Sequence, residues 1–122
     1  MALAVTGVAA AGVANAERTP PCSFKLSPPQ VVQVSGASIV TATVAPAACE
    51  VPANPHLSVA CLKLQGSDSP GQCMDATGIV TARVYYAYRP GATYVSTGKG
   101  CASTGNPPRS ICQSIGPYTA TL

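Results

Sequence analysis

The chain has 122 residues, of which 47% are hydrophobic, 9% charged and 5% aromatic. This length fits one compact domain, and the apolar content excludes a chain kept disordered by its charge. The net charge is +3, and no run of basic residues is present to track a nucleic-acid backbone. Composition therefore predicts one small globular domain that does not bind nucleic acid, but it does not identify a function.

The N-terminal segment, residues 1–16, is apolar, small and uncharged. It ends in Ala14-Asn15-Ala16, which fits the small-x-small rule of signal peptidase. The run is shorter than the roughly 20 apolar residues that a membrane-spanning helix needs. We therefore expect residues 1–16 to be a removed signal peptide and residues 17–122 to be the mature domain, with no membrane span. The expected location is extracellular or in the cell envelope.

The six cysteines indicate disulfides, because an even number in a small exported chain is typical of a cross-linked domain. They are Cys22, Cys49, Cys61, Cys73, Cys101 and Cys112. The alternative is a metal site, which needs close pairs such as C-x-x-C so that two ligands reach one ion. No two of these cysteines are that close, and His56 is the only histidine. We therefore predict no metal site.

The first half of the mature chain shows strand signals and lacks the three- and four-residue apolar spacing of helices. Ser35-Gly36 predicts a tight turn between two short β-rich segments. Prolines, which cannot donate ladder hydrogen bonds, argue against a strand over residues 45–55. The strands predicted here are Gln30–Val34, Ser38–Ala45 and Leu57–Gln65.

In the second half, a short strand is predicted over Gln72–Asp75 and the strongest one over Ile79–Arg89. Alternation in the latter predicts a core face made of Val80, Ala82, Val84, Tyr86 and Tyr88. Pro90-Gly91 predicts a turn, after which Ala92–Thr97 returns as the hairpin partner. Residues 98–100 and 105–108 are predicted loops, and the last strand is Tyr118–Leu122.

About seven short strands with turn signals between them predict an all-β fold, an antiparallel β-sandwich of immunoglobulin-like type. Its core is poor in large side chains, because Phe24 is the only phenylalanine and tryptophan is absent. Disulfides, each contributing about 2–4 kcal/mol, would offset so thin a core.

Sequence alone does not select one cysteine pairing, but turn positions rank them. Cys101 and Cys112 flank the turn-forming Asn106-Pro107, so Cys101–Cys112 ranks first. Cys61–Cys73, which flanks a turn near Ser67, ranks second, and Cys22–Cys49 follows by elimination. The main alternative is an inter-sheet bond from Cys61 to Cys101, as in immunoglobulin-type sandwiches.

Catalytic patterns are weak. His56 with a serine and Glu50, Asp68 or Asp75 would formally complete a triad, but no G-x-S-x-G elbow supports it. Asp68 lies in a Gly- and Ser-rich turn, where aspartate commonly stabilises the turn itself. No glycine-rich loop precedes a helix, so a phosphate site is not indicated. We predict no catalytic residue and no cofactor.

One face of the strongest strand carries a candidate contact surface. Alternation places Arg83, Tyr85 and Arg89 on the side opposite the predicted core face. Tyrosine and arginine are enriched in binding hot spots, although both are also ordinary strand residues. We predict that these three side chains form one exposed patch.

The leader end Ala14-Asn15-Ala16, together with the strands at Ser38–Ala45, Leu57–Gln65 and Ile79–Thr97, resembles small secreted immunoglobulin-like sandwich proteins of actinobacteria. Mycobacterial exported antigens are of this kind. The chain is also similar in size and type to the apoproteins of antibiotic-carrying chromoproteins, but none of their ligand-site residues can be matched here.

The sequence thus favours an exported, non-catalytic interaction module whose partner is a protein or a cell-envelope component. Two alternatives stay open. One is a carrier that holds a small apolar ligand between its sheets. The other is a secreted inhibitor, with residues 98–108 as its exposed loop, or a hydrolase. Oligomeric state is not indicated.

We expect the secreted protein to begin at Glu17, because signal peptidase cleaves after the second small residue of its recognition site. N-terminal sequencing or intact-mass measurement of secreted material checks this. A secreted form that retains Met1 would contradict the expectation.

Overall fold

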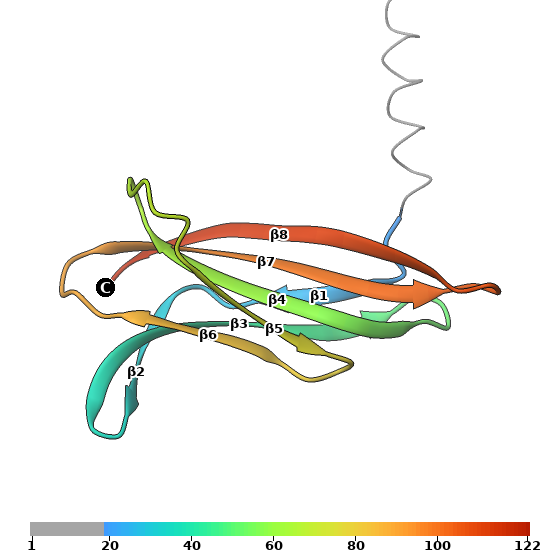
Figure 1. Ribbon diagram of the computed structural model, residues 1–122, viewed down its shortest axis with the longest axis horizontal. Coiled ribbons are helices and arrows are strands. Elements are labelled where there is room, and N and C mark those ends of the chain that lie inside the picture. The colour runs from blue at the N-terminus through green and yellow to red at the C-terminus, as the bar shows by residue number, and fades with distance from the viewer. Residues whose placement is uncertain (1–18) are drawn as a thin grey trace, which may run out of the picture.

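The structure, a computed structural model, describes residues 19–122, and every regular element in this range is a β-strand (Figure 1). Two four-stranded antiparallel sheets pack face to face, so the predicted all-β antiparallel sandwich is confirmed. The predicted signal peptide, residues 1–16, lies outside the described residues. The strands are β1 (Cys22–Leu26), β2 (Gln30–Val34), β3 (Ala37–Cys49), β4 (Asn54–Leu64), β5 (Gln72–Thr77), β6 (Ala82–Ala87), β7 (Thr93–Thr104) and β8 (Arg109–Thr121).

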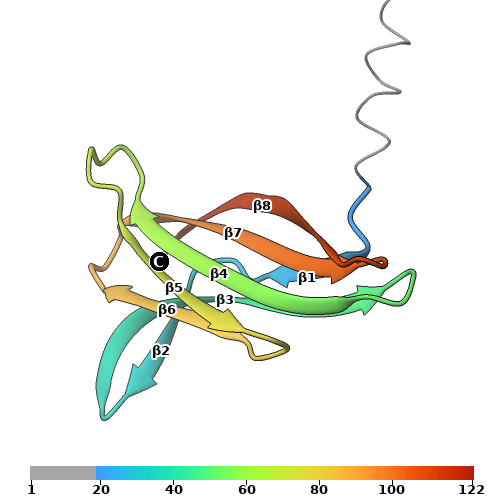
Figure 2. The ribbon, with the colours of Figure 1, turned by 45° about the vertical axis from the view of Figure 1, so that its right-hand side comes forward.

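The first sheet, called sheet A, is built around β3. Strands β1 and β2 lie end to end along one side of β3, and β6 pairs with its other side. The register pairs Lys25 with Ala45, Val32 with Ile39 and Tyr85 with Thr41. Figures 1 and 2 both show the β2–β3 hairpin projecting away from the body of the sandwich.

The second sheet, called sheet B, has the strand order β5-β4-β7-β8. Its two central strands are long, and β8 runs beside β7 over nearly the whole length of both. The side chains facing sheet A include Ala60 and Leu62 of β4 and Tyr94 of β7, all fully buried. Sheet A contributes buried Phe24, Leu26, Val40, Ala42, Val44, Ala82 and Val84 to the same core.

The sheets approach closely where β7 carries glycine. A Cβ atom on Gly100 would collide with the ring of Phe24 on β1, and one on Gly98 would lie 2.6 Å from Cγ2 of Val44 on β3. Both glycines are buried. The bare backbone of β7 therefore provides the space that the only phenylalanine of the chain fills. The prediction that residues 98–100 form a loop is wrong, because these residues form the middle of β7.

The predicted hairpin between residues 79–89 and 92–97 is also wrong. Strand β6 pairs with β3 in sheet A, whereas β7 pairs with β4 and β8 in sheet B. The Pro90-Gly91 turn is present, with Gly91 at φ +83°, but it takes the chain across from one sheet to the other. Turn residues specify that the chain reverses, not which edge it pairs with next.

Other strand boundaries differ from the prediction. Strand β1 was not predicted, and β3 continues through Pro46 to Cys49. Proline is tolerated there because β6 pairs with β3 only as far as Val44, which leaves one edge of β3 open beyond that point. Val80, predicted to lie in the core, is 61% exposed because it precedes β6.

The structure pairs the cysteines as Cys22–Cys49, Cys61–Cys73 and Cys101–Cys112. These are the three pairs expected from the sequence, two of them from turn positions and Cys22–Cys49 by elimination. In each case the two residues are direct partners on neighbouring antiparallel strands. Each disulfide thus lies within one sheet. The alternative bond from Cys61 to Cys101, expected to join two sheets, is not formed, and both cysteines lie in sheet B, on β4 and β7.

We expect Gly100→Ala to lower the free energy of unfolding by about 1–3 kcal/mol, the usual cost of overpacking a core, because the added methyl group meets the Phe24 ring. Urea unfolding followed by far-UV circular dichroism measures the change. Lys99→Ala, at the exposed neighbouring position, is the matched control and should leave stability nearly unchanged. Equal stability of Gly100→Ala and the wild type would show that the sheets are not in close contact there.

Candidate functional site

The outer face of sheet A, the face turned away from sheet B, is the candidate contact surface. Arg83 pairs with Thr43 and Tyr85 with Thr41, so both side chains point away from the buried Ala82 and Val84. Arg83 is exposed, and Tyr85 is 42% exposed. The strand alternation therefore brings Arg83 and Tyr85 together on one exposed face.

Arg89 is also exposed, but it lies past the end of β6, in the turn that leads to β7. The alternation that places Arg83 and Tyr85 does not extend to it. Its backbone is held by the buried Tyr94, whose hydroxyl accepts a hydrogen bond from the Arg89 N–H at 2.7 Å and donates one to the Ala87 carbonyl at 2.8 Å. Tyr94 belongs to sheet B, so it fixes the crossing between the sheets beside the patch. Arg89 thus borders the surface formed by Arg83 and Tyr85.

Lys25 adds a cation to this face. It pairs with Ala45, which lies on the same outward face of β3 as Thr41 and Thr43. Lys25 is exposed and lies on the opposite side of β3 from Arg83. Sequence reasoning missed it because β1 was not predicted, although the exposed-buried alternation of CSFKL was available as a signal.

No strand of sheet A carries a carboxylate. Among the described residues the acids are Glu50, just after β3, Asp68, in the β4–β5 turn, and Asp75, on β5 of sheet B. The outer face of sheet A therefore carries Lys25, Arg83 and Tyr85, with Arg89 just past the end of β6. We call this set the cationic face.

His56 has one notable contact. Its Nε2 lies 2.7 Å from the hydroxyl oxygen of Ser110 on β8. A Ser-His-acid triad also needs a carboxylate on the other ring nitrogen. None of the hydrogen bonds recorded for the described residues joins His56 to Glu50, Asp68 or Asp75. Likewise, no group of three or more His, Cys, Asp or Glu side chains in the described range is placed to hold a metal ion.

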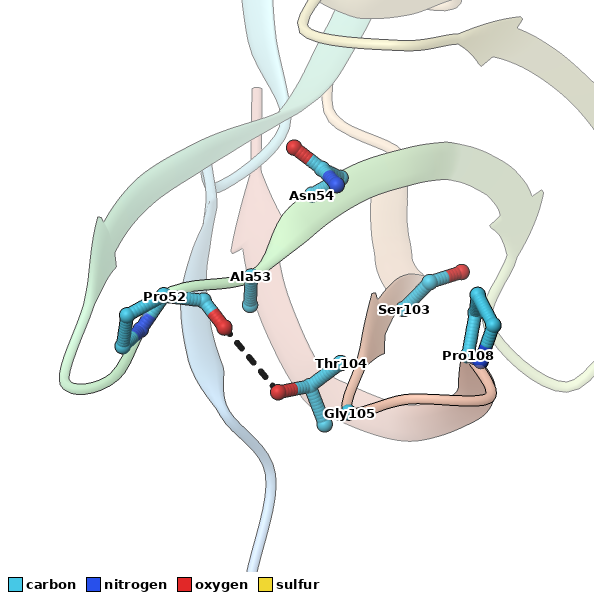
Figure 3. Close-up of a pocket in the computed structure, with 7 residues that line it drawn as sticks. All are labelled: Pro52, Ala53, Asn54, Ser103, Thr104, Gly105 and Pro108. Carbon is cyan, nitrogen blue, oxygen red and sulfur yellow. Dashed lines mark hydrogen bonds between the residues drawn. The ribbon is translucent and has the colours of Figure 1, made fainter.

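A cavity of about 430 Å³ lies at one end of the molecule, between the segment that enters β4 and the β7–β8 turn (Figure 3). The Thr104 hydroxyl donates a hydrogen bond of 3.0 Å to the Pro52 carbonyl beside it. Asn54 and Ser103 also line this cavity, so its lining is partly polar. It does not lie between the sheets, where the carrier alternative requires an apolar cleft. The exposed loop of the inhibitor alternative is also shorter than predicted, because residues 98–104 belong to β7.

Comparison with protein-family models, curated proteins and solved structures finds no match to this chain. Over residues 19–122, no helix is long and apolar enough to cross a membrane.

We expect Tyr94→Phe to lower the free energy of unfolding by about 1–3 kcal/mol, because it leaves the Arg89 N–H and the Ala87 carbonyl without their partner. Amide hydrogen exchange at Arg89 should become faster, and urea unfolding should report the lost stability. Tyr118→Phe is the control, since Tyr118 is 44% exposed. Unchanged exchange at Arg89 would show that Tyr94 does not hold the segment beside the cationic face.

Proposed function

We propose that the chain is an exported, non-catalytic binding module that engages a protein or a cell-envelope component through the cationic face. The observation that carries this proposal is that exposed Tyr85 and Arg83 lie on one face of a sheet whose strands carry no carboxylate. Tyrosine and arginine are enriched in binding hot spots. An interface rich in cations selects an acidic partner and speeds its approach.

Export is supported by the three disulfides, which are typical of extracellular proteins. The predicted leader over residues 1–16 supports it independently. The two packed antiparallel sheets support the immunoglobulin-like class and the resemblance to small exported sandwich proteins of actinobacteria. The disulfides of this chain, however, lie within its sheets and do not join them. Binding is favoured over catalysis because His56 and Ser110 have no carboxylate partner among the recorded hydrogen bonds.

The test begins with capture of partners from the envelope of the producing organism and from host extracellular material. A captured partner is purified, and its affinity for the wild type is compared with that of Arg83→Ala/Tyr85→Ala. We expect the double variant to bind at least about tenfold more weakly, which corresponds to roughly 1.4 kcal/mol. Binding should also weaken as salt is raised, because exposed charges are screened.

The matched control is Lys63→Ala/Lys99→Ala, which removes two exposed cations from the outer face of sheet B instead. It should bind as the wild type does. Equal losses in both double variants would indicate attraction by net charge alone. Unchanged affinity of Arg83→Ala/Tyr85→Ala for the partner would show that the cationic face is not the binding site.

A further inference from the structure

Strand β2 is an exposed edge strand without charge. It pairs with β3 only, and its other edge is open. Four of its five residues are exposed, including Val31 at 36% and Val34 at 42%. Its sequence, QVVQV, consists of β-branched and amide residues. An edge of this kind presents unpaired backbone groups to any strand that can lie alongside it.

The hairpin turn determines which backbone groups are free. Ser35 at φ +52° and Gly36 at φ +83° form a two-residue turn, and Val34 pairs with Ala37 across it. In such a hairpin the closing pair is hydrogen-bonded, and bonded and non-bonded pairs then alternate. Val31 and Gln33 therefore belong to non-bonded pairs. Their N–H and C=O groups point away from β3, toward the open edge.

The rest of this edge of sheet A is protected. Ahead of β2 the chain carries Pro28-Pro29, which lack donors, and β1 carries Lys25 and a register shift between Cys22 and Phe24. Prolines, charges and bulges are the usual devices that prevent edge-to-edge pairing. Strand β2 has none of them. The unprotected part of the edge is thus confined to β2.

Strand β2 can pair with a second copy of itself, because an antiparallel pair of identical strands is symmetric and β2 carries no charge to repel its copy. We propose that two copies of the chain associate through antiparallel pairing of β2 with β2, about a two-fold axis that passes beside Val32. In this register the free N–H of Val31 donates to the free C=O of Gln33 of the second copy. The free N–H of that same Gln33 donates in return to the C=O of Val31. Symmetry repeats the exchange, which makes about four hydrogen bonds. Val32 then lies opposite Val32 of the second copy, with no charges in conflict.

The dimer has a structural consequence. The pairing joins the two A sheets edge to edge into one continuous antiparallel sheet, with both cationic faces on the same side. A five-residue strand pair is smaller than a standard interface of about 1,200–2,000 Å². The association is accordingly weak and concentration-dependent, and it presents two copies of the contact surface to one partner.

The experiment is sedimentation equilibrium of the purified, disulfide-bonded chain up to about 1 mM, where a dimer with a Kd of about 1 mM is still detected. We expect a monomer–dimer equilibrium. Isotope-filtered NMR on a mixture of labelled and unlabelled chains should show intermolecular contacts between residues 31 and 33. A chain that stays monomeric throughout this range overturns the proposal.

Two variants test the edge. Val32→Lys places like charges opposite each other at the axis, and Val31→Pro removes an outward donor that β3 does not use. Each should lower the association constant at least tenfold. Ile39→Lys is the matched control, because Ile39 is the direct partner of Val32 on the same face but lies one strand away from the edge. Circular dichroism confirms folding of each. A dimer that survives Val32→Lys and Val31→Pro, or is lost equally in Ile39→Lys, shows that β2 is not the interface.

Discussion

The contact between the Phe24 ring and the bare backbone of β7 is the constraint on which the sandwich depends. Gly98 and Gly100 lack the side chains that would otherwise hold β1 and β3 away from β7. The remaining core consists mainly of Val and Ala, which bury little apolar area per residue. Two hydrogen bonds reinforce the approach near this point. Gln113 donates to the Cys22 carbonyl at 2.6 Å, and Ser96 donates to the Ser27 carbonyl at 3.0 Å.

The disulfides act in a different direction from this contact. Cys22–Cys49 fastens β1 to β3, Cys61–Cys73 fastens β5 to β4, and Cys101–Cys112 fastens β8 to β7. In each case an edge strand is linked to its inner neighbour. The cohesion between the two sheets is left to side-chain packing and a few hydrogen bonds. Of the strands along the sheet edges, β2 and β6 alone have no covalent link.

Sequence patterns predicted those features of the fold that depend on neighbouring residues in the chain. The alternation around Arg83 and Tyr85 is readable because a period of two repeats within a few residues. Residues 98–100 were predicted as a loop because Gly-Lys-Gly has low strand propensity. The residue that requires glycine in this strand is Phe24, which lies far away in the chain. The hairpin after Pro90-Gly91 was predicted from the turn residues, which are also a local signal. A turn signal does not reveal that Tyr94 holds the chain as it crosses to the other sheet.

The cationic face was predicted only in part, since Lys25 reaches it through a pairing between strands that are distant in sequence. Its charge comes from the distribution of a few residues rather than from the mild net charge of the chain. The described acids lie in the β4–β5 turn, on β5 and just beyond β3, so the cations of sheet A remain uncompensated on its outer face. A weak contact surface of this kind gains most from being duplicated. When two copies are joined, the second contact forms at a high effective concentration, so the total affinity can rise by orders of magnitude without any new contact. The exposed, uncharged edge of β2 lies in the same sheet as this face, and pairing there would turn two weak sites into one bivalent surface.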